Sequence, residues 1–233
     1  MARKRRTIAW KWRILAFLVL VAAGVGAWQW WELVHWAPPR AAYPVQGVLV
    51  GDQDGDVNFH GLRAIGADFA YLEASSGADS RDPAFARNLA GIAGSGLQYG
   101  VVHRYDPCVR AEKQAANFVT IVPRDETLLP PAIELDETAE DCEAPVSDPE
   151  VESELTTFLN QVEGHVGKHA LLKVSPAFEA KYRIAARLER ELWLTGDRFQ
   201  PDYGGRPWML WTANAQLHTE ANSGGIRWVV VQP

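Results

Sequence analysis

Residues 99–136, YGVVHRYDPCVRAEKQAANFVTIVPRDETLLPPAIELD, contain the alternation that predicts the fold. Two short apolar runs, Tyr99–His103 and Ala132–Asp136, enclose the segment Ala111–Val122, which has the length and the apolar spacing of a helix. A strand, a helix and a second strand in this order are typical of a parallel sheet whose crossover connections are helical.

The same alternation extends through most of the chain. Further helices are predicted over Pro83–Gly94, Asp148–Val166 and Pro176–Arg190, whereas the connections after Leu192 are rich in Gly, Pro and Asn and show no helical period. We therefore expect an α/β fold, an irregular TIM-like barrel with five β/α units followed by three strands. The predicted strands are Gly47–Val50, Phe69–Glu73, Tyr99–His103, Ala132–Asp136, Ala170–Val174, Leu192–Thr195, Met209–Thr212 and Trp228–Val231.

The composition fits one globular domain with an additional basic segment. The 233 residues are 47% hydrophobic and 22% charged, and the formal net charge is −6. Residues 1–40 carry seven Lys or Arg and one acid, so residues 41–233 carry 16 bases against 28 acids. An excess of acids makes the domain a poor partner for polyphosphates, which argues against nucleic acid as its main ligand.

A membrane segment explains the basic start of the chain. Residues 14–27, ILAFLVLVAAGVGA, carry no charge, and the uncharged run reaches Trp31, which is about the length needed to cross a bilayer. We expect a signal anchor over residues 14–31 in the inner membrane, with the basic residues 1–13 in the cytoplasm. A signal peptide cleaved after Val25-Gly26-Ala27 is the alternative, and both interpretations export the domain to the periplasm or beyond.

Residues 32–43, ELVHWAPPRAAY, are expected to be a linker, in which Pro38-Pro39 favours an extended, semi-rigid spacer. The barrel domain is then expected over residues 44–233. Its two cysteines, Cys108 and Cys142, are expected to pair in the oxidising compartment, and two unpaired buried thiols are the alternative.

Several short stretches of the chain resemble one known family. They are Gly47–Val50 with Gly55-Asp56-Val57, Phe69–Gly77, Asp82-Pro83 with Phe85 and Asn88, Gly100–His103, Gln114–Phe118 and Leu129–Ala132. In this order, over nearly all of residues 44–212, they resemble the glycoside hydrolase family 25 lysozymes. The resemblance implies the five-plus-three barrel and cleavage of the bond between N-acetylmuramic acid and N-acetylglucosamine in peptidoglycan.

The residues at the family's catalytic positions depart from its pattern. The family has an Asp in the first strand, an Asp-x-Glu pair at the end of the fourth and an Asp near the carboxyl terminus. Here these positions fall on Leu49, on Glu134 with Asp136, and near Arg227 or Trp228. Other departures are Glu73 in place of a Lys, Ser76 in place of a Glu, Lys173 in place of a Tyr, and Thr212-Ala213-Asn214 in place of Gln-Tyr-Ser. The resemblance therefore implies a degenerate catalytic site.

Glu134 and Asp136 are the candidate catalytic pair. They lie two residues apart on a predicted strand, so their side chains point the same way, and the carboxyl ends of barrel strands form the functional face. Two nearby carboxylates raise the pKa of one of them, which supplies a proton donor. From their positions in the family pattern, the resemblance implies that Asp136 donates the proton and that Glu134 orients the acetamido group or stabilises the positive sugar. The alternative is a solvated acidic loop over residues 134–143.

Four further residues are candidates for substrate binding: Glu73, His103, Tyr105 and Trp211. His103 ends a strand and could contact a sugar, although a histidine satisfied by its neighbours is an equal alternative. Tyr105 and Trp211 could stack on sugar rings, although aromatic residues in barrels more often belong to the core. We expect no cofactor and no metal, because the acidic loop 52–56 has its glycine one place too early for a calcium site and lacks the distal Glu.

These observations predict a membrane-anchored muramidase whose partners are the glycan strands of peptidoglycan and, through the amino-terminal helix, the membrane. The alternative is an inactive barrel that binds the cell wall or holds a protein partner. A hydrolase with a changed glycan substrate is a third interpretation.

Overall fold

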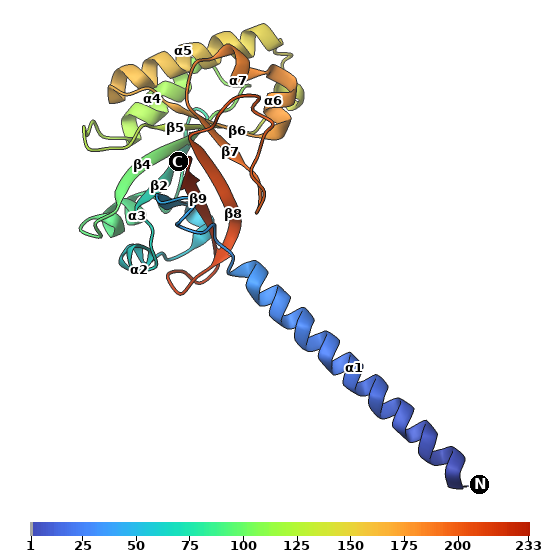
Figure 1. The fold of residues 1–233 in the computed structure, drawn as a ribbon. Helices are drawn as coiled ribbons and strands as arrows, with labels where there is room; N and C mark the ends of the chain where they lie inside the picture. The colour runs from blue at the N-terminus through green and yellow to red at the C-terminus, as the bar shows by residue number, and fades with distance from the viewer. Residues whose placement is uncertain (1) are drawn as a thin grey trace. The chain divides into compact units, whose positions relative to one another are not determined.

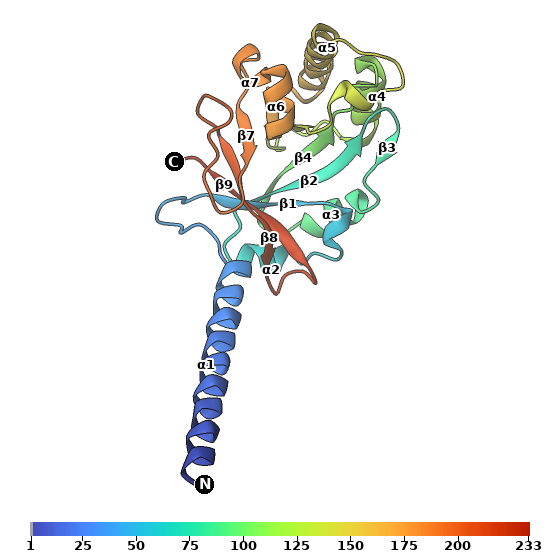
Figure 2. The same ribbon diagram turned by 90° about the vertical axis from the view of Figure 1, so that its right-hand side faces the viewer.

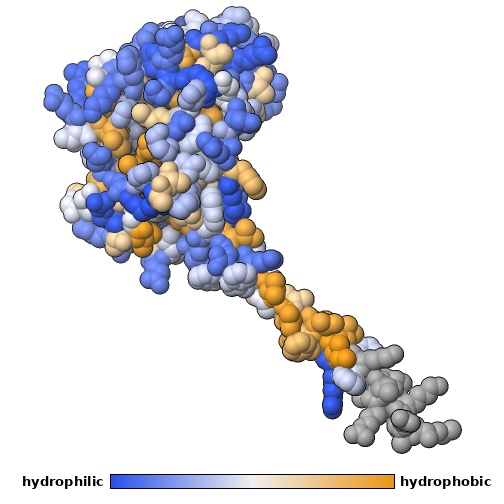
Figure 3. Space-filling model, in the orientation of Figure 1, coloured by the Kyte–Doolittle hydropathy of each residue, from blue (hydrophilic) through white to orange (hydrophobic). Residues whose placement is uncertain are grey.

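The computed structural model describes the backbone of residues 2–233 and the side chains of Trp10 and of residues 12–233. The chain divides into two compact units, Met1–Trp36 and Ala37–Pro233. The first is a single helix, α1 (Ala2–Val34), shown in Figure 1. Its stretch Trp12–Val34 has a mean hydropathy of 1.8 and no buried residue, and Figure 3 shows mostly apolar side chains along its described part. By length and composition this helix can cross a membrane, a property that a signal sequence shares.

The second unit is a closed barrel of eight strands. Each strand is parallel to its neighbour except β9, which is antiparallel to both β8 and β1, and the pairing of β1 with β2 closes the barrel. A two-residue strand, β3 (Ser80–Arg81), is added to the end of β2. The barrel strands are β1 (Gln46–Val50), β2 (Phe69–Ser76), β4 (Gln98–Arg104), β5 (Ala132–Leu135), β6 (Leu171–Val174), β7 (Leu192–Thr195), β8 (Leu210–His218) and β9 (Gly225–Val231). All eight predicted strands are confirmed, and with them the irregular TIM-like barrel.

Helices cover the first part of the barrel. They are α2 (Phe59–Ala64), α3 (Phe85–Ile92), α4 (Ala111–Ile121), α5 (Asp148–Val166), α6 (Pro176–Tyr182) and α7 (Ile184–Arg187). Helices α4 and α5 pack against each other, and α4 lies against β2 (Figure 1 and Figure 2). The helix expected over 176–190 is instead divided at Arg183, whose φ of 54° lies in the left-handed region and ends α6. As predicted, the described chain has no helix between Leu192 and Pro233.

Apolar side chains fill the middle of the barrel. Leu49, Tyr71, Val102, Trp193 and Val229 belong to one buried cluster that takes members from most strands. A Cβ at Gly100 would lie 2.4 Å from the Tyr71 ring, so only glycine leaves room for this aromatic side chain. The middle of the barrel is therefore a packed core rather than a channel, and a ligand can reach only its ends.

The expected spacer is folded back onto the barrel. The side-chain amide of Gln46 donates to the carbonyls of Pro38 and Tyr43, both at 2.9 Å, and its oxygen accepts from Trp228 Nε1 at 2.7 Å. Arg40 forms an ion pair with Asp68 at 2.7 Å. These contacts hold residues 38–43 of the expected linker at the start of β1.

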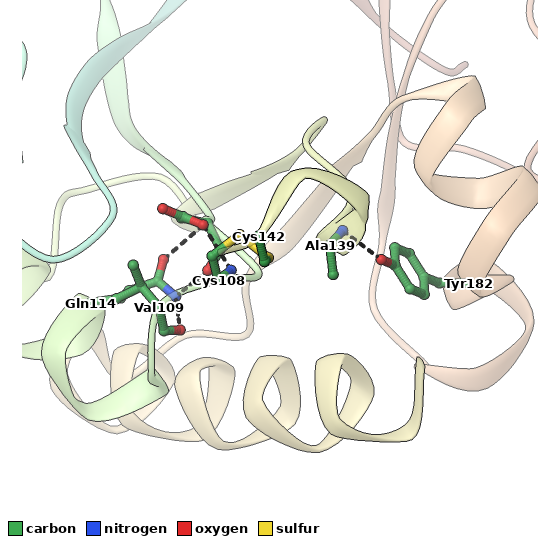
Figure 4. The surroundings of a disulfide bond; sticks show 7 residues. Cys108, Val109, Gln114, Ala139, Cys142 and Tyr182 are labelled. Carbon is green, nitrogen blue, oxygen red and sulfur yellow. Dashed lines mark hydrogen bonds between the residues drawn. A yellow bond between two sulfur atoms is a disulfide. The ribbon is translucent and has the colours of Figure 1, made fainter. Parts of the chain in front are cut away.

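The predicted disulfide between Cys108 and Cys142 is present, with a Cα–Cα distance of 5.3 Å. It joins the loop after β4 to the 3₁₀ turn after β5, as Figure 4 shows. Next to it the amide N–H of Ala139 donates to the Tyr182 hydroxyl at 2.8 Å. The disulfide and this hydrogen bond tie the loops that follow β4 and β5 to each other and to the end of α6.

Candidate functional site at the carboxyl end of the barrel

Seven of the eight barrel strands are parallel, so their carboxyl ends meet at one end of the barrel, which we call the mouth. Above the apolar core the strands end in charged and polar side chains. These are Glu73 from β2, Arg104 from β4, Glu134 from β5, Lys173 from β6, Thr195 from β7 and, from the antiparallel strand, Arg227 of β9. The mouth therefore combines a hydrophobic floor with a ring of charges.

Two hollows open at the mouth, on either side of Glu134. The serine hollow has a volume of about 220 Å³ and is lined by Glu73, Ser76, Ser80, Arg81, Arg104 and Glu134, among others. The aspartate hollow has a similar volume of about 220 Å³ and is lined by Glu134, Asp136, Lys173, Ser175, Pro176 and Thr195, among others. Glu134 and Asp136 thus border the same hollow, and Glu73 lines its neighbour.

Glu134 is held by two cations. Its carboxylate forms an ion pair with Lys173 and lies 3.3 Å from Arg104 Nε. Burial alone would raise the pKa of Glu134, but these positive charges outweigh burial and lower the pKa below its ordinary value. Glu134 is therefore ionised at neutral pH and is unsuited to donate a proton. The sequence predicted that a neighbouring carboxylate raises the pKa of one member of the pair, whereas the pKa of Glu134 is governed by the two cations.

Asp136 has different surroundings. It follows the last residue of β5 and is exposed. Within the described part of the chain, no hydrogen bond or ion pair holds its carboxylate. Of the two predicted catalytic residues, one is therefore fixed and charged while the other is free to meet a ligand.

A second buried charge cluster lies across the mouth. Arg227 Nη2 lies 2.9 Å from Asp54 Oδ2, and its guanidinium also pairs with Glu73. The three side chains are only 16%, 4% and 14% exposed for Arg227, Asp54 and Glu73. Burial alone would lower the pKa of Arg227, but the two carboxylates raise it above its ordinary value. We call this set the Arg227 cluster.

The Arg227 cluster joins two of the departures from the family pattern. Arg227 pairs in register with Leu49, so the first-strand position at which the resemblance implies an acid lies beside Arg227, at or next to the position of the terminal acid. Glu73, which stands where the family has a lysine, supplies the negative charge to Arg227. Sequence analysis did not find this cluster, because Arg227 is 154 residues from Glu73 and 173 from Asp54. The only signal is one arginine within the apolar strand GIRWVVV.

His103 does not contact the mouth, in contrast to the expected sugar contact. It is fully buried, with its ring 4.8 Å from that of Phe158. Its Nδ1 lies 2.8 Å from Ser75 Oγ, and its Nε2 lies 3.4 Å from Gln114 Oε1. Because the Gln114 amide nitrogen donates to the carbonyls of Asp106 and Val109, Oε1 is the acceptor, so Nε2 carries the proton and Ser75 donates to Nδ1. His103 is thus a structural residue that its neighbours satisfy.

Tyr105 and Trp211 are also buried, so the expected stacking on sugar rings is not compatible with their positions. Tyr105 is fully buried with its ring 5.7 Å from that of Phe158. Trp211 is 3% exposed, packs on Trp208 and donates from Nε1 to the Gly196 carbonyl at 2.7 Å. Both belong to the core, which was the alternative interpretation.

The acidic loop after β1 contributes to the Arg227 cluster rather than to a separate site. Residues Asp52–Asp54 form a 3₁₀ turn, and the Asp54 carboxylate accepts from the Gly51 amide at 2.7 Å. Among the side chains that the structure describes, no three His, Cys, Asp or Glu residues are grouped so that they could hold a metal ion.

Comparisons with known proteins agree on one family. The model described as glycosyl hydrolases family 25 matches residues 50–222. The protein YegX of Escherichia coli K12, described as uncharacterized, is 24% identical over 193 residues, which cover 80% of this chain and 69% of that protein. A family 25 glycosyl hydrolase from Bacillus anthracis has a similar structure, with a TM-score of 0.76 and 24% identity over 85% of this chain and 93% of its own. A bacterial lysozyme from Streptomyces coelicolor has a TM-score of 0.70 and 19% identity, covering 81% of this chain and 92% of its own.

Proposed function

This chain belongs to glycosyl hydrolase family 25, and on that premise we propose that its barrel is an exported, membrane-anchored domain that acts on the glycan strands of peptidoglycan. The observation that carries the proposal is the arrangement of Glu134 and Asp136 at one hollow of the mouth. The apolar helix α1 supports the anchor in the inner membrane, and the disulfide supports an oxidising compartment outside the cytoplasm.

The chemistry of cleavage assigns one role to each carboxyl group. Asp136 would protonate the glycosidic oxygen as the bond from C1 of N-acetylmuramic acid breaks. Glu134, ionised beside its two cations, would stabilise the positive charge that develops on the sugar or orient its acetamido group. Water then adds to C1 and gives up a proton that restores the acid form of Asp136, which leaves a new reducing end on N-acetylmuramic acid and a free hydroxyl on N-acetylglucosamine.

A second candidate function is glycan binding without cleavage, and the Arg227 cluster favours it. The resemblance implies acids at Leu49 and near Arg227 or Trp228, where this chain has none, and the cations of the mouth neutralise Glu73 and Glu134. Less negative charge at the mouth means less stabilisation of an oxocarbenium-like transition state. A domain of this kind would hold wall glycan, or a protein partner, without hydrolysing it.

One experiment separates these functions. The full chain in nonionic detergent would be incubated with purified peptidoglycan, and the released fragments would be identified by mass spectrometry. Hydrolysis predicts fragments with new muramic acid reducing ends from the wild type, and none from Asp136→Asn or Glu134→Gln. Glu137→Gln, the exposed acid next to the pair, serves as the matched control and should keep the activity.

Binding is measured in parallel by sedimentation with insoluble peptidoglycan. Co-sedimentation without fragments would support the second candidate function. A folded, disulfide-bonded chain that neither releases fragments nor sediments with peptidoglycan would overturn both glycan functions and favour a protein partner instead.

A further inference from the structure

The end of the barrel opposite the mouth, which we call the amino end, carries most of the exposed apolar side chains of the barrel unit. Five large apolar side chains of this unit are exposed, and three of them are Val45, Ile65 and Met209, with exposed fractions of 45%, 49% and 39%. Val45 directly precedes β1, Met209 directly precedes β8, and Ile65 lies in the turn before β2. Segments that precede parallel strands gather at the amino end of a barrel.

Two of these residues are joined through the end of β9. Strands β8, β9, β1 and β2 are consecutive neighbours in the sheet, so the segments before β8, β1 and β2 lie side by side. The Gln232 amide donates to the Met209 carbonyl at 2.9 Å, and the Val231 amide donates to the Val45 carbonyl at 3.0 Å. Met209 and Val45 therefore lie on either side of the end of β9.

Arg40 connects the third residue to the same surface. Its guanidinium donates to the carbonyl of Pro44 at 2.8 Å and also to the carbonyl of Gly66. Pro44 precedes Val45 and Gly66 follows Ile65, so the two apolar residues flank one guanidinium. The three apolar residues thus form one continuous surface, which we call the amino-end patch.

Positive charge accompanies the amino-end patch. Arg40 and Arg63 both pair with Asp68, at 2.7 and 2.8 Å, and their side chains are 47% and 49% exposed. Because two cations share one carboxylate, this group of three keeps a net positive charge. An apolar surface beside exposed arginines suits the headgroup region of an anionic bilayer, where apolar atoms leave water and the cations stay near lipid phosphates.

Tyr43 adds an aromatic ring to this end of the barrel. Its ring lies 5.7 Å from that of Trp211 and 6.5 Å from that of Trp208, and the side chain stays partly exposed. Tyrosine combines an apolar ring with a polar hydroxyl, and it is enriched where lipid meets water.

The chain also enters the barrel at the amino end. Figure 2 shows the segment that leads into β1 in light blue, at the end of the sheet opposite β3. Only residues 35–37 separate Pro38, which is held by the Gln46 side chain, from Val34, the last residue of α1. Four Cα steps span at most about 14 Å. A lipid surface at the carboxyl end of α1 is therefore close to the amino end along the chain, whichever direction the helix takes.

We propose that the amino-end patch, together with Arg40, Arg63 and Tyr43, rests on the surface of a bilayer that contains anionic phospholipid, so that the mouth faces away from the membrane. The inference rests on the membrane anchor of the proposed function and not on the chemistry of the mouth. A free tether would let the barrel turn in every direction, whereas a docked amino end fixes the direction in which the mouth opens.

The test measures how close single side chains lie to lipid, in the full chain reconstituted in vesicles of phosphatidylethanolamine and phosphatidylglycerol. Because Cys108 and Cys142 form a disulfide, one introduced cysteine is the only free thiol and can carry an environment-sensitive fluorophore. Labels on Ile65→Cys and Met209→Cys should emit at shorter wavelength than in detergent-free buffer and lose emission when the vesicles contain spin-labelled lipid.

A label on Phe199→Cys is the matched control. Phe199 is 82% exposed, more than any residue of the amino-end patch, but it follows the carboxyl end of β7 and so belongs to the side of the mouth. If docking is specific to the amino end, this label should show neither the shift nor the quenching.

A charged variant tests the chemistry of the contact. Ile65→Glu combined with Met209→Glu should abolish the quenching of a label on Val45→Cys, whereas Phe199→Glu should leave that quenching unchanged. Replacing phosphatidylglycerol with phosphatidylcholine should reduce the quenching, because the two arginines then lose their anionic partners. Near-ultraviolet circular dichroism checks that each variant is folded, and the labels on the chain without glutamates do not depend on this variant.

Flotation of the vesicles separates failure of the anchor from failure of docking. A chain that does not float with the vesicles refutes the anchor of the proposed function and docking with it. A chain that floats, but whose labels at 65 and 209 are quenched no more than the label at 199, refutes docking and leaves the anchor standing. Labels at 65 and 209 that are shielded from aqueous iodide but not quenched by lipid would show that protein, such as a second copy of this chain, covers the amino end, and would also overturn the proposal.

Discussion

Replacing Arg227 with methionine tests whether the mouth depends on its buried charges. Methionine keeps most of the apolar stem of arginine, so the main change is the loss of the positive charge between Asp54 and Glu73. Removing one partner from a buried ion pair costs about 3–5 kcal/mol, because the remaining charge stays without compensation. Two carboxylates remain here, both at most 14% exposed, so we expect a loss of about 4 kcal/mol.

The measurement is thermal unfolding of the full chain in nonionic detergent, followed by near-ultraviolet circular dichroism. For a domain of about 200 residues each kcal/mol shifts the midpoint by about 2–4 °C, so Arg227→Met should melt about 8–16 °C below the wild type. Adding Glu73→Gln and Asp54→Asn removes the uncompensated charges and should restore most of the loss. Mass spectrometry of the folded protein checks that the disulfide is intact.

A surface ion pair provides the control. Arg63 pairs with Asp68 at 2.8 Å, but their side chains are 49% and 27% exposed, so Arg63→Met should cost at most about 1 kcal/mol. If Arg227→Met melts within the range of this control, the charges at the mouth are solvated. The argument for a buried, neutralised site would then fail.

Three further predictions follow from the structure. Glu134→Gln should lower the free energy of unfolding at pH 7, because Lys173 and Arg104 lower the pKa of Glu134 in the folded chain against the effect of burial. In urea titrations the difference between the variant and the wild type should therefore shrink below about pH 4.5, and a difference that stays constant with pH would contradict the ion pairs. The His103 ring should stay neutral in NMR titrations to about pH 4, because burial lowers its pKa to about 4. The unfolded chain binds this proton near pH 6.5, so the free energy of unfolding should fall as the pH is lowered from 6.5 to 4. A ring that titrates near pH 6.5 would refute its burial. Replacing Cys108 and Cys142 with serine should lower the free energy of unfolding by about 3.8 kcal/mol on the chain-entropy argument for a 34-residue separation, and a midpoint unchanged by the replacement would show that the bond constrains little.

The strands could be predicted because a buried strand leaves a local run of apolar residues in the sequence. Runs such as Val48–Val50 and Leu192–Leu194 are apolar over their whole length, as strands enclosed by helices and core must be. Strand β8 is longer than predicted because its second half, Ala213–His218, alternates polar and apolar residues and pairs with β9 beyond the parallel part of the barrel. Helix α2 was not predicted, since six residues capped by Asn58 are too few to show a helical period.

The site could be predicted only in part, because its geometry depends on residues far apart in the sequence. Glu134 and Asp136 share a hollow because they are two residues apart at the carboxyl end of β5, a spacing that the sequence does show. The folded-back residues 38–43 depend on the Gln46 side chain and on Trp228, which no local pattern links. His103 lies between Val102 and Arg104 on β4, so its side chain faces the opposite side of the sheet. There it contacts Phe118 of α4 and Phe158 of α5, which lie far from it in the sequence.

The charges of the mouth follow one physical requirement. A cation in a buried site needs an anion beside it, and two cations there would repel each other in a medium that screens them poorly. With Arg227 on β9, a lysine at position 73 would place two positive charges in contact, so a glutamate at 73 is what Arg227 requires. The same holds for Lys173, whose only described ion-pair partner is Glu134. Glu73 and Arg227 therefore compensate each other's charge in the buried mouth. Restoring a single acid at Leu49 or Arg227 should consequently destabilise the barrel unless position 73 changes with it.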